Sequence, residues 1–121
     1  MDANVLNALK INPVIDITTT GRTSGQPRRI EIRLLDLDRG FALSGRPGRP
    51  RSWYANLRAQ PDFTVHVKNG ATADLPARAT PITDPAERRA IFTEMAQDPS
   101  RGGMDVEEWL KVSPLVLVEF T

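Results

Sequence analysis

The sequence contains no cysteine and a single histidine, His66. Without cysteine the chain forms no disulfide, carries no thiolate nucleophile and offers no sulfur ligand to a metal. One histidine alone also disfavours a histidine-rich metal centre or a serine–histidine relay. These absences predict a protein without a resident metal.

Long apolar runs are missing as well. No stretch approaches the roughly 20 apolar residues that a membrane-spanning helix requires. The first residues, MDANVLNALKINP, lack the basic start and long apolar segment of a secretory signal. We therefore expect a cytoplasmic protein without a membrane span.

Positive charge is concentrated in one part of the chain. Residues 18–51 hold eight arginines and three acids, a net charge of about +5, whereas the whole chain carries +1. Within this stretch, residues 21–25 (GRTSG) and 44–49 (SGRPGR) combine glycine, arginine and hydroxyl groups. Glycine lets backbone N–H groups approach an oxyanion, and arginine supplies a fixed fork of donors. The two segments therefore predict an anion-binding site.

Apolar periodicity predicts short strands with a few short helices between them. In residues 28–35, for example, Ile30, Ile32 and Leu34 alternate with polar residues and are expected to face inward. The expected strands are 14–20, 28–35, one that begins at 41–43, 63–67, 71–82 and 115–120, with Asn69-Gly70 as a tight hairpin turn. The expected helices are 2–10, 52–59, one that begins at Asp84 and 105–112, capped by Asp2, Ser52, Asp84 and Asp105.

Six short antiparallel strands in a chain of 121 residues are best closed into a small barrel, because closure leaves few free edges. The length fits one domain. We expect residues 1–121 to form a single domain, with a helix and lead-in over 1–13 and the barrel over 14–121. The fold class expected is mainly β (α+β).

Three segments resemble the deazaflavin-dependent nitroreductase family. They are residues 18–28 (TTTGRTSGQPR), 41–70 (FALSGRPGRPRSWYANLRAQPDFTVHVKNG) and 84–89 (DPAERR), followed by the terminal apolar strand. The loop pattern GR-x-SG-x-PR together with W-Y-x-N-L is more specific than either motif alone. The resemblance implies a six-stranded antiparallel split β-barrel of the FMN-binding kind.

The resemblance also implies a cofactor. It is coenzyme F-420, a deazaflavin that carries two electrons as hydride and bears a phosphodiester and an anionic oligoglutamate tail. The phosphate and tail are expected on the first glycine-rich loop, and the ring system beside the second. The implied cofactor-binding residues are Arg22, Thr23, Ser24, Gly25, Arg28, Ser44, Gly45, Arg46, Trp53 and Asn56.

No catalytic set of side chains is visible, so the difficult chemistry falls to a cofactor that the protein orients. Ser44 and Tyr54 are the candidates for stabilising negative charge on a reduced acceptor. Met104 and Trp109 stand where relatives often place substrate-contacting tyrosines, and Trp109 is a candidate for the substrate mouth. His66 lies on the polar face of its strand and is expected to be solvated.

The sequence departs from the family pattern at Thr23, where a lysine is common, so the tail site loses one charge. The function expected is hydride transfer to a small electron-poor acceptor such as a quinone or a nitroaromatic compound. FMN in place of the deazaflavin is an alternative, and so is a non-catalytic cofactor carrier. Monomer and homodimer are both compatible with the sequence.

Basic loops beside Trp53 and Tyr54 also allow a nucleic-acid-binding module. However, the isoelectric point is only about 8.2, and residues 52–121 carry a net charge of about −3. No extended basic groove is implied, so we do not expect nucleic acid as a partner.

Overall fold

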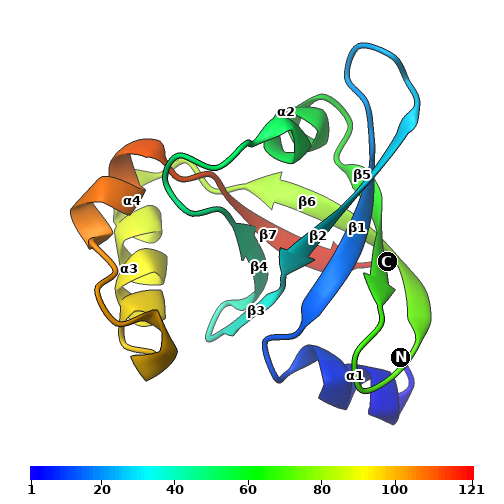
Figure 1. The fold of residues 1–121 in the computed structure, drawn as a ribbon, viewed down its shortest axis with the longest axis horizontal. Coiled ribbons are helices and arrows are strands. Elements are labelled where there is room, and N and C mark those ends of the chain that lie inside the picture. The colour runs from blue at the N-terminus through cyan, green and yellow to red at the C-terminus, as the bar shows by residue number, and fades with distance from the viewer.

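The computed structural model describes residues 1–121 and shows a seven-stranded antiparallel sheet that curls into a half-barrel (Figure 1). Its order is β2-β1-β5-β6-β7-β4-β3. The split-barrel expectation is therefore confirmed, with one strand more than predicted. The strands are β1 (Val14–Thr20), β2 (Pro27–Arg33), β3 (Leu35–Leu37), β4 (Gly40–Ser44), β5 (Asp62–Val67), β6 (Ala73–Pro81) and β7 (Leu115–Phe120).

The extra strand arises at Leu34. The sequence predicts one strand over 28–35, but Leu34 divides this segment into β2 and β3, which are the two edges of the sheet. Leu34 is fully buried, and its N–H donates to the Pro13 carbonyl at 2.9 Å. Because only this residue separates the two edge strands, the edges of the curled sheet meet there.

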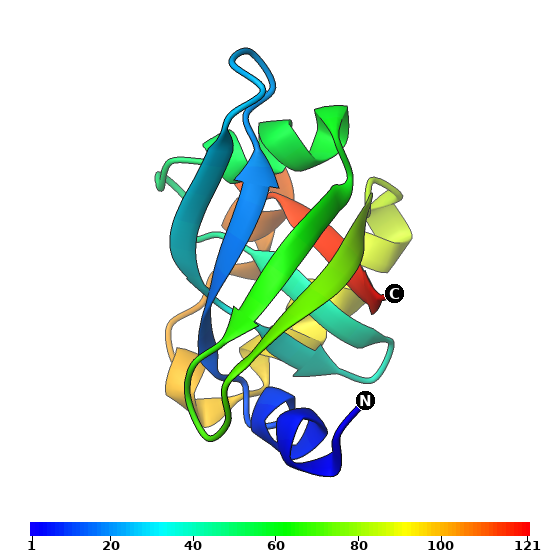
Figure 2. The ribbon, with the colours of Figure 1, turned by 90° about the vertical axis from the view of Figure 1, so that its right-hand side faces the viewer.

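Helices cover the ends and one side of the sheet (Figures 1 and 2). Asp2, Asp84 and Asp105 cap helices as predicted. Ser52 does not, because Arg51 holds the N-cap position of its helix without a side-chain cap. No helix combines the length and apolar character needed to cross a bilayer. The helices are α1 (Ala3–Leu9), α2 (Ser52–Ala59), α3 (Pro85–Ala96) and α4 (Val106–Val112), with a short 3-10 helix, η1 (Pro99–Arg101).

Two apolar clusters form the core. The larger, of 16 buried residues, fills the barrel interior, and the smaller, of 7, lies between the sheet and α3, where it contains Ile91, Phe92 and Met95. Strand β2 is the exception to this packing. Its expected inward residues are poorly covered, since Ile32 is half-buried and Ile30 is 36% exposed. The prediction that this whole strand buries one face is therefore wrong.

Candidate functional site

Asn56 fastens the first glycine-rich loop, between β1 and β2, to α2. Its side-chain oxygen accepts from the Arg22 backbone N–H at 3.1 Å and from the Arg22 guanidinium at 3.0 Å. Its amide nitrogen donates to Thr19 Oγ1 at 3.1 Å. Asn56 and Thr19 are both buried. The loop is thus held against α2 by a buried amide whose hydrogen bonds are used within the protein.

The loop is also braced internally. The Gly21 N–H donates to the Gln26 carbonyl, and the Gly25 N–H to the Gly21 carbonyl, both at 2.8 Å. The Ser24 hydroxyl accepts from the Gln26 N–H at 3.1 Å and from Arg28 at 3.4 Å. A Cβ on Gly21 would lie 2.7 Å from that hydroxyl oxygen and 3.2 Å from the Gln26 carbonyl oxygen, so a side chain there would force the Ser24 side chain and the loop to shift. These hydrogen bonds hold the backbone of the loop in one conformation, which sets the positions of its exposed residues, Thr23 included.

The second predicted segment begins where β4 ends. The Ser44 hydroxyl donates to the Pro114 carbonyl at 2.6 Å. A Cβ built on Gly45 would lie 3.8 Å from the Trp53 ring, which is itself only 7% exposed and belongs to the barrel core. Tyr54 packs edge-to-face on Trp53 and lies under the Arg58 guanidinium, 5.8 Å from its ring centroid. Through α2, this segment and the first loop lie at the same end of the barrel (Figure 1).

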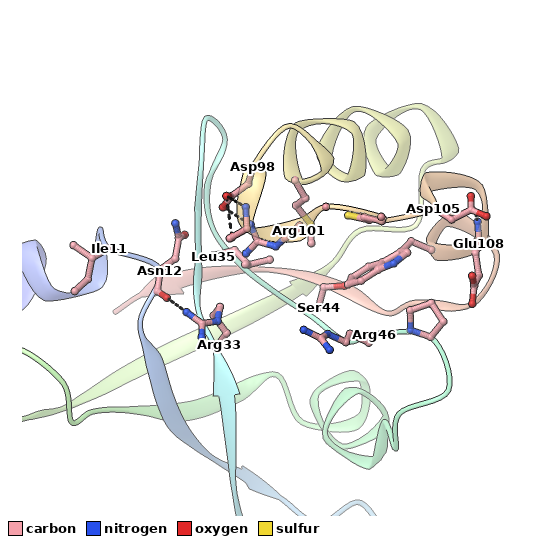
Figure 3. A pocket seen from close by; sticks show the side chains of 17 residues that line it. Ile11, Asn12, Arg33, Leu35, Ser44, Arg46, Asp98, Arg101, Asp105 and Glu108 are labelled. Atoms are coloured by element: carbon pink, nitrogen blue, oxygen red, sulfur yellow. Dashed lines mark hydrogen bonds and ion pairs between the residues drawn. The ribbon is translucent and has the colours of Figure 1, made fainter.

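A cavity of about 870 Å³ opens beside Ser44, between the sheet and the helical layer (Figure 3). Ser44 and Arg46 line it from the β4 side, while Met104 and Trp109 line it from the segment before β7. Trp109 is fixed by an edge-to-face contact with Phe92, 5.8 Å between ring centroids. The cavity thus combines an aromatic wall with charged groups of both signs, Arg33, Arg46 and Arg101 against Asp98, Asp105 and Glu108.

Most polar groups of this cavity already have protein partners. Arg33 donates to the Asn12 carbonyl at 2.7 Å, and Arg101 pairs with Asp98 at 2.7 Å. Hydrogen bonds from the Ser100 N–H and hydroxyl, together with Arg101, hold the pKa of Asp98 below its ordinary value. The Arg46 side chain has neither a salt bridge nor a hydrogen bond, so it is the cavity arginine free to meet a ligand.

Unpaired arginines also surround α2. Residues 20–28 and 44–60 contain no acid at all. None of the arginines in these ranges takes part in a salt bridge, whereas six cations elsewhere are paired with carboxylates. The unpaired residues are Arg22, Arg28, Arg46, Arg49, Arg51 and Arg58. These six arginines, none of which forms a salt bridge within the chain, are what we call the α2 arginine surface.

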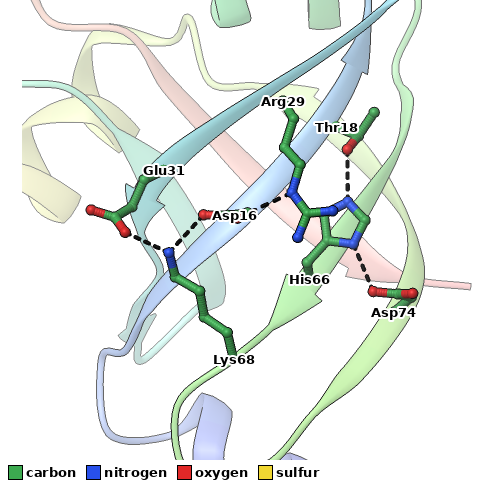
Figure 4. A network of polar contacts seen from close by, with 7 residues as sticks. All are labelled: Asp16, Thr18, Arg29, Glu31, His66, Lys68 and Asp74. Atoms are coloured by element: carbon green, nitrogen blue, oxygen red, sulfur yellow. Dashed lines mark hydrogen bonds and ion pairs between the residues drawn. The ribbon is translucent and has the colours of Figure 1, made fainter.

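Outside this surface, on the outer face of β1, β2, β5 and β6, charged groups are paired with one another (Figure 4). Lys68 bridges Asp16 at 2.8 Å and Glu31 at 2.5 Å, and Asp16 also accepts from Arg29. His66 belongs to the same face. Its side chain is only 12% exposed and lies 2.7 Å from both Thr18 Oγ1 and Asp74 Oδ1, so the expectation of a solvated histidine is wrong.

The predicted residues thus fall into two groups. Arg22 to Arg28 join Asn56 at the hairpin loop, and Ser44 and Arg46 reach the cavity. Trp53 and Tyr54 lie between these groups and do not line the cavity. The sequence interpretation missed the far wall around η1, although Asp98-Pro99 repeats the cap signal seen at Asp84-Pro85.

Residues 1–113 match the model of the family described as F420H(2)-dependent quinone reductase. The chain belongs to this family. Coenzyme F-420 is therefore its cofactor and oxidoreduction its class of chemistry, as the resemblance implied.

Solved structures agree with this fold. The structure of an F420-H2 dependent reductase (FDR-A) is 25% identical over 88% of this chain and 94% of its own, with a TM-score of 0.62. ChuZ of Campylobacter jejuni is 12% identical with a TM-score of 0.71; the match covers 97% of this chain but only 51% of ChuZ, about half its length. A structure described as a domain-swapped dimer is 24% identical over 88% of this chain and 80% of its own, with a TM-score of 0.60.

The residues present in this member of the quinone reductase family fit the coenzyme. Its phosphodiester and tail are anionic, and the α2 arginine surface offers guanidinium groups that no carboxylate neutralises. The cavity is of a size that accepts a cofactor-like ring and has an aromatic wall at Trp109. When bound, the deazaflavin supplies a hydride, which no side chain here can do.

Proposed function

We propose that this protein transfers hydride from reduced coenzyme F-420 to a small, planar, electron-poor acceptor, with quinones as the first class to test and nitroaromatic compounds as the second. The observation that carries the proposal is the cavity beside Ser44, which adjoins the α2 arginine surface through Arg46. A cofactor anchored by its anionic part on that surface would have its ring end within reach of this cavity.

In this proposal the hairpin loop binds the anionic part. Arg22 and Arg28 supply charge, while Thr23, Ser24 and Gly25 supply hydroxyl and backbone donors. Asn56 has a different task, because its polar atoms are occupied by Thr19 and Arg22. It positions the loop. Trp53 similarly has a positioning task, because it is packed in the barrel core and its ring lies beside Gly45.

Arg46 is the residue we assign to charge stabilisation on the acceptor. Ser44 was the candidate from sequence, but its hydroxyl proton is committed to the Pro114 carbonyl. Its oxygen therefore accepts a hydrogen bond and is suited to orienting an N–H or O–H group. Arg46 lines the same cavity without a partner and carries a permanent charge, which is what a developing oxyanion requires. Tyr54 lies outside this cavity.

The acceptor side of the cavity favours flat apolar molecules. Met104 and Trp109 form a wall from the segment before β7, and Leu35 contributes from β3. Such a wall packs well against a ring, and Arg46 would meet one of its oxygens. Both quinones and nitroaromatic compounds present this combination of ring and polar oxygen.

The test is equilibrium binding followed by turnover. The purified protein is titrated with oxidised coenzyme F-420 and, in parallel, with FMN, at low and at high salt, by fluorescence. We expect the deazaflavin to bind more tightly than FMN and its affinity to fall as salt screens the arginines. Oxidation of the reduced coenzyme is then followed with a quinone and with a nitroaromatic acceptor.

Each alternative has its own outcome. Tighter binding of FMN would favour an FMN protein in the same barrel. Tight binding of the deazaflavin without turnover over many acceptors would favour a carrier. Absence of binding to either would contradict the proposal, and salt-dependent retention on nucleic acid would then favour a role for the basic loops as a nucleic-acid surface.

A further inference from the structure

Strand β2 has a free edge. It pairs only with β1, and the next strand along the chain, β3, lies at the opposite edge of the sheet. The two edges differ in length, since β3 has three residues and β2 has seven. Six of the seven residues of β2 are exposed and the seventh, Ile32, is half-buried, so no other part of the chain covers this edge (Figure 2).

The phase of the β1–β2 ladder shows which backbone groups are unpaired. The register pairs Ile17 with Ile30, and the same register continues to the hydrogen bonds Gly21 N–H to Gln26 and Leu34 N–H to Pro13. In an antiparallel ladder hydrogen-bonded pairs recur at every second residue. Residues 28, 30 and 32 therefore bond to β1. Residues 29, 31 and 33 point their N–H and C=O groups away from it, toward the free edge.

A second copy of β2 can pair with this edge in only a few registers. In a two-fold antiparallel pair, residues directly opposite each other lie on the same face, so registers differ by steps of two. Placing Ile30 opposite Ile30 of the second copy sets Arg29 opposite Glu31, twice. The neighbouring registers set Arg29 opposite Arg29, or Glu31 opposite Glu31 with Arg29 opposite Arg33. Of these three registers, only the first is electrostatically complementary. A register centred on Ile32 would set Glu31 opposite Arg33, but it pairs only residues 31–33 of each β2, whereas the first register pairs all seven residues.

The side chains of Arg29 and Glu31 each have atoms that make no hydrogen bond within the chain and are available for such a contact (Figure 4). Arg29 bonds Asp16 through Nε alone, which leaves both terminal nitrogens free. Glu31 accepts from Lys68 through Oε2, which leaves Oε1 free. Their side chains are 57% and 63% exposed. The favoured register also makes the 29–31 pairs hydrogen-bonded, because these residues carry the free backbone groups.

We propose that two copies of this chain associate through antiparallel pairing of their β2 edges, centred on Ile30, with reciprocal Arg29–Glu31 ion pairs. The partner is a second copy because the charge order along β2 is complementary to itself in this register. The association joins the two sheets edge to edge and covers Ile30, the exposed apolar residue of the strand. It does not depend on the proposed function.

Charge reversal tests the pairing. Sedimentation velocity over a wide range of protein concentration is expected to show a reversible dimer of the unmodified chain. Arg29→Glu and Glu31→Arg each place like charges opposite each other, so each variant alone should dimerise at least about tenfold more weakly. An equal mixture of the two variants restores two opposite-charge pairs and should form a heterodimer. Arg78→Glu, which reverses an exposed arginine on the interior strand β6, is the matched control and should dimerise normally.

A single introduced cysteine tests the register, because the chain has none of its own. Ile30→Cys puts two thiols directly opposite each other in a non-hydrogen-bonded pair and should cross-link on mild oxidation. Arg28→Cys is the control. In the same register its two thiols stand four residues apart along the strand, about 13 Å, and should not cross-link efficiently.

Three results would overturn the proposal. The first is an unmodified chain that remains monomeric at high concentration. The second is a mixture of the two variants that fails to associate although circular dichroism shows each of them to be folded. The third is a dimer that persists unchanged in Arg29→Glu. The last result would point to a domain-swapped or other interface.

Discussion

The two charged regions of this protein use the same residue types in opposite ways. On the outer face of the sheet, Arg29 and Lys68 are neutralised by Asp16 and Glu31 within the chain. Around α2, arginines stand where the local sequence supplies no acid. Paired cations contribute to the folded state itself. Unpaired cations gathered on one surface add mutual repulsion, which an anionic ligand relieves. The comparison separates arginines that serve the fold from arginines available to a ligand.

Of the substitutions considered, removal of Asn56 should have the largest effect on the α2 arginine surface, because Asn56 holds the hairpin loop against α2. Asn56→Ala leaves the buried Thr19 hydroxyl and the part-buried Arg22 N–H without partners. We expect a loss of about 2–3 kcal/mol in the free energy of unfolding, measured by urea denaturation, together with weaker coenzyme binding at a temperature where the variant is folded. Stability equal to that of the unmodified chain would contradict the anchoring role.

Arg28→Ala should separate binding from stability. Arg28 is exposed and makes only a long hydrogen bond to Ser24 within the chain, at 3.4 Å. If it meets an anionic group of the coenzyme, its removal costs about 1.5 kcal/mol of binding, roughly tenfold in affinity, with little change in melting temperature. Arg78→Ala is the matched control, since Arg78 is exposed but paired with Asp62 on another strand. Equal losses in both variants would show a non-specific charge effect.

Gly21→Ala should weaken the same surface without removing a charge. The new Cβ would lie 2.7 Å from Ser24 Oγ and 3.2 Å from the Gln26 carbonyl oxygen, so the loop must shift. We expect coenzyme affinity to fall severalfold, about 1 kcal/mol, measured by the same fluorescence titration. Unchanged affinity would mean that the conformation of the loop does not matter for binding.

The smallest effect is expected on the paired face, from Lys68→Met. Hydrogen bonds from Lys68 and then from Arg29 hold the pKa of Asp16 below its ordinary value of 3.8. A carboxyl with a lowered pKa stabilises the fold above its ordinary pKa, and this contribution is lost as pH falls through the lowered value. The variant should therefore show a higher pKa for Asp16 by NMR titration and a stability that depends less on pH below about 3.8. Coenzyme affinity should not change.

The sequence predicted correctly those structural features that depend only on residues close together in the chain. The cap at Asp84, with Pro85 at the first turn and Glu87 donating its N–H to the Asp84 carboxylate at 3.0 Å, is complete within four residues. The role of the two glycine-rich segments in binding the cofactor stays a prediction.

Features set by distant contacts were missed. Asn69-Gly70 predicts a two-residue turn, but β5 and β6 are joined by residues 68–72. Gly70 keeps a positive φ of 81°, while the Asn69 side chain donates to the Val14 carbonyl at 2.9 Å and draws the connection toward β1.

The break at Leu34 was missed for a similar reason. It depends on where the two edges of the curled sheet meet, which no local pattern records beyond two successive apolar residues, Leu34 and Leu35. The partners of Asn56 could not be predicted from sequence either, because Thr19 and Arg22 lie more than thirty residues away along the chain. Its place near a ligand stays a prediction.

The position of β7 has a consequence for how the protein is made. This strand is formed by residues 115–120, yet it lies between β6 and β4 in the interior of the sheet. Until it has left the ribosome, the strands β2-β1-β5-β6 and β4-β3 share no strand pairing and are joined only by the chain, at Leu34 and through α2, and the edges of β6 and β4 that pair with β7 are open. Completion of the barrel must therefore wait for residue 120, and a chain stopped before β7 should aggregate rather than fold.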